Sequence, residues 1–272
     1  MGLGEKSLRP LFLAAFCMDY VALGKSNLLV SRTALGAMAL ANVSDDQQAA
    51  KIISSAYEGG INFFDTSRTS EESEKRLGNA LHGSIRKDIF VATKTRARTR
   101  DEITRDLDLS LTALKTDYID LYQLDAPAFL PKVGGEDGII EKLLHLKKQG
   151  VIHHIGVCTE SFEMARDLLN SEGPWETLQY PFNLLCPLEV QELVFDCHEK
   201  QIGFIAMQPL CGGVVQDIPL ALGFFCKFEN AVPVWGAHSQ EELQQILYFT
   251  ENPPIIDSKF EQELERARFF FN

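Results

Sequence analysis

Ile89-Phe-Val-Ala-Thr-Lys94 and Tyr118-Ile-Asp-Leu-Tyr-Gln-Leu124 are two short apolar runs, separated by the amphipathic segment Asp101–Leu114. Short apolar runs rich in β-branched and aromatic residues predict buried strands, and the longer periodic segment predicts a helix. A strand, a helix and a second strand form a unit in which the two strands lie parallel, because the helix carries the chain back along the sheet. This stretch therefore predicts one β-α-β unit.

The same alternation recurs about eight times along the chain. The expected strands are Arg32–Ala37, Ile61–Thr66, Ile89–Lys94, Tyr118–Leu124, His153–Thr159, Thr177–Asn183, Gly203–Pro209 and Ala231–Ala237. The expected helices are Asp45–Glu58, Glu72–Leu81, Asp101–Leu114, Ile139–Gln149, Phe162–Asn170, Leu188–Lys200, Pro219–Phe228, Gln240–Phe249 and a final helix at Lys259–Phe270. Strict alternation implies a parallel sheet of the α/β class, and eight repeats fit a closed (β/α)8 TIM barrel.

Local signals support these boundaries. The capping pattern S/T-x-x-E/Q occurs at Ser44 with Gln47, at Thr99 with Glu102 and at Ser239 with Glu242. A doubly wound nucleotide-binding fold would usually carry GxGxxG after its first strand, and the sequence has no such motif. Upstream, Tyr20–Leu23 and Leu28–Ser31 flank a glycine-containing turn, which predicts an N-terminal β-hairpin that plugs the bottom of the barrel.

Composition excludes several classes of partner. The chain has 272 residues, with 26 basic and 38 acidic side chains and a formal net charge of −12. The acidic balance argues against binding to nucleic acid or to an anionic membrane surface. No apolar run reaches the ~18 residues that a membrane span needs.

We expect one domain at residues 19–272, preceded by an N-terminal extension at residues 1–18. The apolar stretch that follows Lys6 and Arg9 is at the short limit for a signal peptide. The six cysteines contain no CxxC pair, which favours reduced thiols in a cytoplasmic protein. The histidines form no HxxxH or HExxH pattern, so no metal site is expected.

Barrel enzymes place their chemistry at the C-terminal ends of the strands. Asp65 and Lys94 end the second and third expected strands. Their ion pair would orient a charged lysine toward a reacting oxygen, or would simply close the barrel top. Asp125 ends the fourth strand, and near Asp65 it would tend to hold a proton and act as an acid; the alternative is a solvated loop carboxylate.

The segment Gly236-Ala-His-Ser239 leads from the last strand into a helix. Free N–H groups at a helix N-terminus bind anions, and this position in a barrel commonly holds a phosphate. An ordinary strand-to-helix turn explains the same spacing.

A set of short segments together matches the pattern of one enzyme family. They are Tyr20–Ser31, Leu35–Met38, Gly60–Thr66, Ser73-Glu74 before Leu77-Gly78, Ala92–Lys94, Asp117–Leu124, Ile155–Val157, Leu178-Gln179 with Phe182-Asn183, and Pro209–Gly213. With these segments the chain resembles the aldo-keto reductases, barrel enzymes that use NAD(P)H. They run from about Asp19 to Pro254. The chain is most similar to a branch with a C-terminal iron–sulfur extension; because this chain stops at Asn272, no cluster is expected.

The resemblance implies a catalytic tetrad of Asp, Tyr, Lys and His. Asp65 and Lys94 match it, Ser70 stands at the tyrosine position and Asp125 at the histidine position. In the family the tyrosine gives a proton to the nascent alkoxide, and a serine is shorter and a much weaker acid. Lost general acid catalysis typically costs ~10²–10⁴-fold in rate, so we expect ordinary carbonyl reduction to be poor.

The resemblance also implies where the cofactor, NADP or NAD, would bind. The implied positions are Cys158, Thr159 and Gln179 for the carboxamide, Met207, Gln208, Pro209 and Leu210 at the end of the seventh strand, Gly236, His238 and Ser239 for the phosphate, and Gln244 and Gln245 for the adenine. Because His238 replaces the family's arginine, only a modest preference for NADP is expected.

The leading prediction is an NAD(P)H-dependent oxidoreductase with weakened or altered chemistry. Its substrate would be a small-molecule carbonyl or enone, with protonated Asp125 polarising the enone oxygen. One alternative is a catalytically silent barrel that acts as a binding or regulatory protein. Another is an ordinary reductase in which Ser70 or Tyr122 replaces the tyrosine, although Tyr122 precedes Asp125 by three residues and so faces the opposite way.

Overall fold

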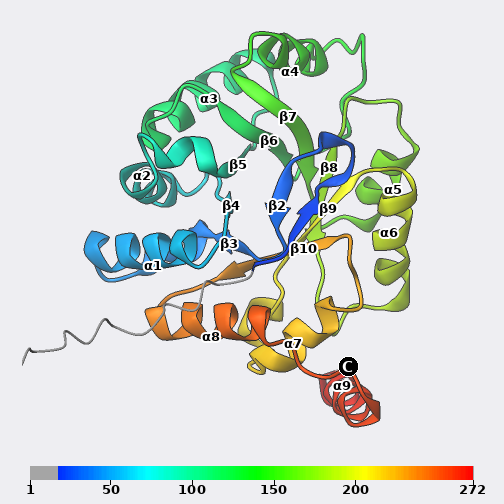
Figure 1. The fold of residues 1–272 in the computed structure, drawn as a ribbon. Coiled ribbons are helices and arrows are strands. Elements are labelled where there is room, and N and C mark those ends of the chain that lie inside the picture. Colours follow the sequence, from blue (N-terminus) through cyan, green and yellow to red (C-terminus); the bar gives the residue numbers. More distant parts are fainter. Residues whose placement is uncertain (1–17, 272) are drawn as a thin grey trace, which may run out of the picture.

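Eight parallel strands close into a barrel that is surrounded by helices (Figure 1). The computed structural model describes residues 18–271. The strand order around the barrel is β10-β3-β4-β5-β6-β7-β8-β9, so the last barrel strand, β10, pairs in parallel with the first barrel strand, β3. The (β/α)8 barrel predicted from the sequence is confirmed.

Every predicted strand and helix overlaps an observed element. The barrel strands are β3 (Ala34–Gly36), β4 (Phe63–Asp65), β5 (Phe90–Thr95), β6 (Ile119–Asp125), β7 (Ile152–Cys158), β8 (Thr177–Pro181), β9 (Gly203–Met207) and β10 (Ala231–Gly236). The helices are α1 (Asp46–Glu58), α2 (Glu71–Ala80), α3 (Arg100–Leu114), α4 (Ile139–Lys148), α5 (Phe162–Asn170), α6 (Leu188–Glu199), α7 (Ile218–Phe225), α8 (Gln240–Glu251) and the C-terminal α9 (Ser258–Phe271).

The helix starts agree with the capping predictions except at α1. Asp45, rather than Ser44, is the N-cap of α1, and its carboxylate accepts the N–H of Gln48 at 2.8 Å. The predicted start was therefore one residue too early. The Thr99–Glu102 capping box at α3 is confirmed, because each side chain accepts a backbone N–H of the other residue.

The N-terminal hairpin pairs β1 (Tyr20–Ala22) with β2 (Leu29–Ser31) and lies across the barrel in Figure 1. Leu23, Leu28 and Val30 join the cluster of side chains that fills the barrel interior, so the hairpin closes one end as predicted. Gly24 is required in the connection, because its φ is +55° and a Cβ there would lie 2.2 Å from the backbone nitrogen of Gly203.

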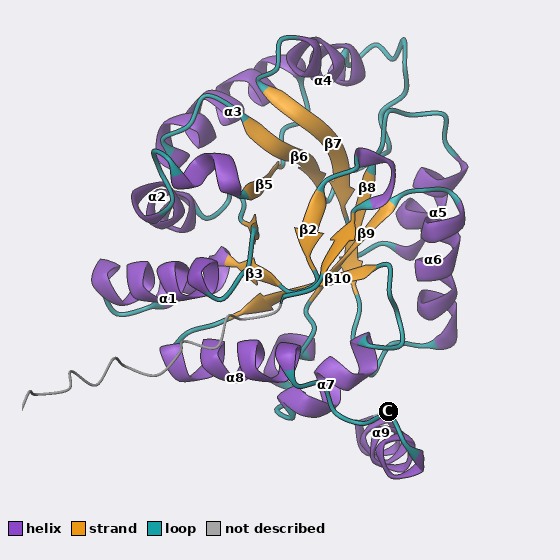
Figure 2. Cartoon of the chain, in the orientation of Figure 1, coloured by secondary structure: helices purple, strands orange, loops and turns teal. Residues whose placement is uncertain are grey.

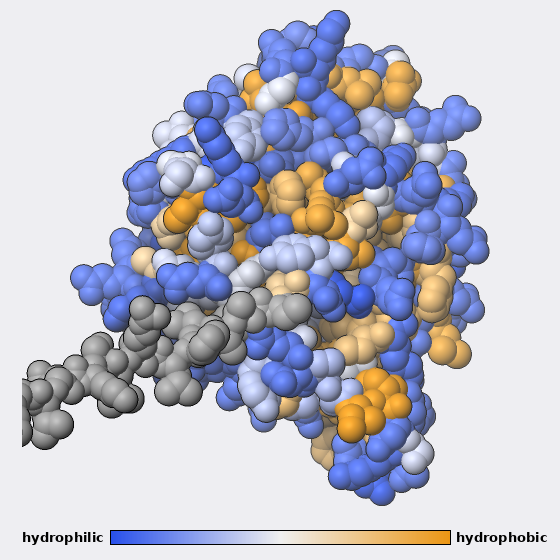
Figure 3. All heavy atoms as spheres, viewed as in Figure 1, coloured by the Kyte–Doolittle hydropathy of each residue, from blue (hydrophilic) through white to orange (hydrophobic). Residues whose placement is uncertain are grey.

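Helices surround the strands of the barrel (Figure 2). A second, larger hydrophobic cluster packs the strands against these helices. The extension expected at residues 1–18 falls outside the described residues except for Met18, which is buried in this cluster. Hydrophilic side chains dominate the face drawn in Figure 3. Within residues 18–271, no helix is both long enough and apolar enough to cross a membrane. The cytoplasmic location stays a prediction.

Candidate active site

Asp65 and Lys94 form a buried ion pair at the C-terminal end of neighbouring strands β4 and β5. Lys94 Nζ donates to both carboxylate oxygens of Asp65, at 2.7 and 2.8 Å, and to the carbonyl of Thr66 at 2.8 Å. Burial, the largest single effect, would lower the pKa of Lys94, but the charge and hydrogen bond of Asp65 together with its other neighbours, Cys158 and Asp125, outweigh burial and raise that pKa. The lysine is therefore held in its charged form.

Two glutamine side chains anchor this pair to the barrel interior. Gln179 Nε2 donates to Asp65 Oδ2 at 3.1 Å, and Gln123 Nε2 donates to Gln179 Oε1 at 2.7 Å. Gln179, expected to hold a cofactor carboxamide, thus has both ends of its amide paired within the protein. Sequence reasoning missed Gln123. The alternation of side chains along a strand could have identified it. Gln123 is two residues from Leu121 and therefore faces the same side, which is the inside of the barrel.

Asp125, at the end of β6, pairs with Arg96. Arg96 Nε donates to Asp125 Oδ2 at 2.9 Å, with side-chain exposures of 63% for Arg96 and 13% for Asp125. The prediction of a protonated Asp125 considered only Asp65 and Lys94 as its neighbours and omitted Arg96. That protonation stays a prediction.

Ser70 lies just before α2, on the loop that follows β4. Although it occupies the N-cap position, its hydroxyl caps no N–H of the helix. Its carbonyl accepts the N–H of Ser73 at 3.0 Å and that of Glu74 at 3.3 Å. On the same loop, Arg68 Nη1 lies 2.6 Å from the buried carboxylate of Glu74. This ion pair fixes the loop that carries Ser70.

Tyr122 packs in the hydrophobic layer between the strands and the helices and is fully buried. Burial raises the pKa of its hydroxyl. The opposite-facing position predicted from strand alternation is confirmed, so Tyr122 does not stand in for the family's tyrosine at the barrel mouth.

Cys158 and Thr159 follow one another at the end of β7, and both are buried. Cys158 Sγ lies 3.8 Å from Met207 Sδ, and burial raises the pKa of the Cys158 thiol to about 12. The thiol is therefore protonated at neutral pH. Thr159 Oγ1 accepts the N–H of Ser161 at 3.1 Å, which leaves the hydroxyl able to donate.

The segment after β9 forms a turn at the rim. Gln208 has a φ of +57°, and its side chain donates to Glu160 Oε1 at 3.2 Å. Its carbonyl accepts from Asn183 Nδ2 at 3.1 Å. Pro209 is buried and Leu210 is half-buried. These contacts tie the expected cofactor segment to the loops that follow β7 and β8.

The start of α8 is occupied by the chain's own carboxylates. Ser239 caps the N–H of Glu242 at 3.2 Å, and Glu242 Oε2 accepts the N–H of His238 at 2.8 Å. The Glu241 carboxyl group accepts hydrogen bonds from its own backbone N–H, which has the larger effect, and from the hydroxyl of Ser239. Both hydrogen bonds lower the pKa of this carboxyl group. Two negative charges thus lie where the sequence predicted a phosphate site. Gly236 precedes this turn and is exposed.

Gln244 and Gln245 lie on α8 and are both exposed. They are available to a ligand that extends along the outside of the helix. Neither contacts the Asp65–Lys94 pair in the described part of the chain. An adenine role for these two residues stays a prediction.

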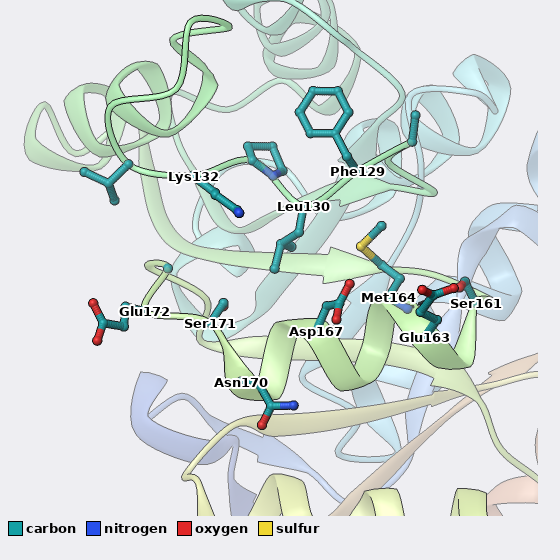
Figure 4. Close-up of a pocket in the computed structure, with 14 residues that line it drawn as sticks. Phe129, Leu130, Lys132, Ser161, Glu163, Met164, Asp167, Asn170, Ser171 and Glu172 are labelled. Carbon is teal, nitrogen blue, oxygen red and sulfur yellow. Dashed lines mark hydrogen bonds between the residues drawn. The ribbon is translucent and has the colours of Figure 1, made fainter.

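A cavity of about 1030 Å³ lies away from these residues, between the β6–α4 loop and α5. In Figure 4, Phe129 and Leu130 on the loop lie opposite Met164 and Asp167 on α5. None of the predicted site residues lines this cavity. The candidate active site is therefore the polar cluster at the barrel mouth.

Comparisons with known proteins agree with this architecture. The uncharacterized oxidoreductase YqkF of Bacillus subtilis is 30% identical over 212 residues, covering 73% of this chain and 67% of that protein. Aldo-keto reductase YhdN of the same organism is 29% identical over 216 residues, covering 73% of this chain and 64% of that protein. The chain thus matches about two thirds of the length of these relatives.

Solved structures share the fold at lower identity. Aldo-keto reductase AKR11C1 from Bacillus halodurans, in its holo form, has a TM-score of 0.78 at 23% identity, covering 92% of this chain and 96% of that one. The thermostable aldo-keto reductase Tm1743, in complex with the inhibitor epalrestat, has a TM-score of 0.78 at 22% identity, covering 92% of this chain and 100% of that one.

The model of the aldo/keto reductase family matches residues 32–221. NAD(P)H-dependent reduction of small-molecule carbonyl compounds is general in this family. The matched range includes the barrel strands from β3 to β9 and the buried Asp65–Lys94 pair. With its closed parallel barrel and this pair at the mouth, the chain belongs to the aldo/keto reductase family.

Proposed function

We propose that this protein is a nicotinamide-dependent oxidoreductase that reduces an activated C=C bond, as in an enone, in preference to a simple carbonyl group. One observation carries the proposal. The Asp65–Lys94 pair is retained and buried, whereas neither Ser70 nor Asp125 is arranged as the acid that carbonyl reduction needs.

The two reactions differ in what they require of the protein. A bound reduced nicotinamide supplies a hydride. Reduction of a carbonyl group leaves an alkoxide, a strong base that an acid must protonate. Hydride addition to an enone leaves a delocalised enolate, which water can protonate after it is released. An enolate oxygen needs positive charge nearby more than it needs a proton.

Lys94 and Arg96 can supply that positive charge. Lys94 Nζ already donates to Asp65 and Thr66, so it acts through its charge rather than through a free N–H. Arg96, which pairs with Asp125, is a second cation on this side of the mouth. Ser70 then leaves room where the family has a tyrosine.

The residues at α8 fit NADH better than NADPH, and we propose NADH as the cofactor. A 2′-phosphate placed there would face the carboxylates of Glu241 and Glu242. Acidic side chains instead accept hydrogen bonds from ribose hydroxyls, and arginine is the residue that accommodates a 2′-phosphate. His238 is itself held by Glu242, at 3.4 Å from Nδ1 to Oε2. This replaces the modest NADP preference expected from the sequence.

A second candidate, the silent barrel, is favoured by the same carboxylates. They occupy the N–H groups that a cofactor phosphate would use, and the amide of Gln179 is occupied as well. In this case neither nucleotide would bind.

The test is NADH consumption with benzylideneacetone, an enone, and benzaldehyde, a simple aldehyde. We expect turnover of the enone to exceed that of the aldehyde by at least ~10-fold, because only the aldehyde requires an acid. Lys94→Met should abolish the enone reaction, while Lys75→Met, which removes a half-exposed lysine on α2, should not. Faster aldehyde reduction would refute the enone proposal. Absence of both turnover and nucleotide binding would establish the silent barrel.

A further inference from the structure

Arginines occupy alternate positions from the β5–α3 loop into the start of α3. Arg96 and Arg98 lie in the loop after the buried Lys94, Arg100 is the first residue of α3, and all three are exposed. The chain as a whole carries a net charge of −12. A run of cations at the mouth of the barrel therefore departs from the general charge of the molecule, and it lies next to the candidate active site.

Two of these arginines reach across to the end of β6. Arg96 Nε donates to Asp125 Oδ2 at 2.9 Å, and Arg98 Nη2 donates to the carbonyl of Ala126 at 2.9 Å. The two Nη groups of Arg96 make no hydrogen bond to a residue within 18–271. A guanidinium presents its N–H groups as a rigid planar fork, which binds a carboxylate through two parallel hydrogen bonds.

Two other cations at the mouth, Lys94 and Arg68, have no comparable donors to spare. Lys94 Nζ is 2.7 to 2.8 Å from its acceptors on Asp65 and Thr66. Arg68 is only 11% exposed and pairs with Glu74 at 2.6 Å and Glu71 at 3.3 Å. Arg96, at 63% exposed, presents a free fork, and its contact with Asp125 holds it beside the site.

We propose that Arg96 is a specificity-determining residue that selects substrates bearing a carboxylate group. The substrate carboxylate binds the Nη groups while Nε stays with Asp125. A carboxylate suits this position better than a phosphate, because a doubly charged group is repelled more strongly by the neighbouring Asp125 carboxylate than a singly charged one. The inference deepens the proposed function by naming the substrate class.

The experiment measures binding and turnover separately. Calorimetry without nucleotide compares benzylideneacetone with its 4-carboxy derivative, and benzoate with phenyl phosphate. We expect the 4-carboxy compound to bind about 10-fold tighter and benzoate to bind tighter than phenyl phosphate. Arg96→Gln should remove the difference between the two enones. Arg105→Gln, which removes an equally exposed charge on α3, should retain it.

Equal affinity for the two enones in the parent protein would overturn the proposal. An equal loss in Arg96→Gln and Arg105→Gln would also overturn it, because the effect would then come from net charge. Tighter binding of phenyl phosphate would overturn the assignment to a carboxylate. If NADH is not consumed but the Arg96-dependent preference persists, the selectivity stands and the proposed reduction fails. If turnover occurs, the selectivity should appear in KM rather than in kcat.

Discussion

Replacing Lys94 with methionine tests whether the Asp65–Lys94 pair supports the barrel mouth. The side chains are 6% and 5% exposed, so both charges are almost entirely shielded from water. After the substitution, Asp65 keeps the hydrogen bond from Gln179 at 3.1 Å but loses its counter-charge. A buried carboxylate without a counter-ion is strongly unfavourable, so the variant should be clearly less stable.

The magnitude follows from the burial. Removing one partner of a buried pair costs about 3–5 kcal/mol, because the remaining charge has been desolvated without compensation. For a domain of this size, each kcal/mol lowers Tm by roughly 2–4 °C. The Tm of Lys94→Met should therefore fall by about 6–20 °C.

Thermal unfolding of three variants provides the assay. Lys94→Met should show the full loss. The Asp65→Asn/Lys94→Met double variant should recover a large part of it, because no unpaired charge remains. Lys75→Met removes a lysine that is 52% exposed, and its Tm should stay within about 2 °C of the parent. The reasoning is refuted if Lys94→Met matches this control, or if the double variant is no more stable than the single one.

The raised pKa of Lys94 makes the stability of the folded protein depend on pH. The pKa of Lys94 is raised in the folded protein above its ordinary value of 10.5. Its stabilising contribution is therefore complete below pH 10.5 and is lost as the pH rises through the folded-state pKa. Urea unfolding on both sides of that pH should show a steeper loss in the parent than in Lys94→Met. Parallel profiles would contradict the raised pKa.

Three further predictions concern the site. Glu242→Gln removes one negative charge at α8, so nicotinamide fluorescence titration should show NADPH binding improved by about 3–10-fold relative to NADH; an unchanged ratio contradicts the proposed NADH selectivity. Tyr122→Phe should change turnover by less than about twofold, because the ring lies in the outer hydrophobic layer; a large loss would make Tyr122 the missing acid. Cys158 should escape iodoacetamide at neutral pH in the folded protein, because burial raises its pKa to about 12, and rapid labelling seen by mass spectrometry would count against that burial.

The sequence by itself determined the barrel and the strand ends that carry the candidate site. Strand and helix periodicity are local properties, so the bounds of α5 were predicted without error and those of β10 to within one residue. Parallel strands bring their C-terminal ends to one face, and this rule placed Asp65 and Lys94 together. The hairpin plug followed from its turn residues and apolar runs.

The tertiary structure decided which side chains pair at that face. Arg96 neutralises Asp125, Gln123 holds Gln179, and Glu242 folds back onto the N–H of His238. Each partner depends on strand stagger, loop path and rotamer, and periodicity carries no information about these. Because parallel strands end at one face of the barrel, the sequence predicted which charged residues share that face. Only the packed structure fixed which of them already have a partner of opposite charge.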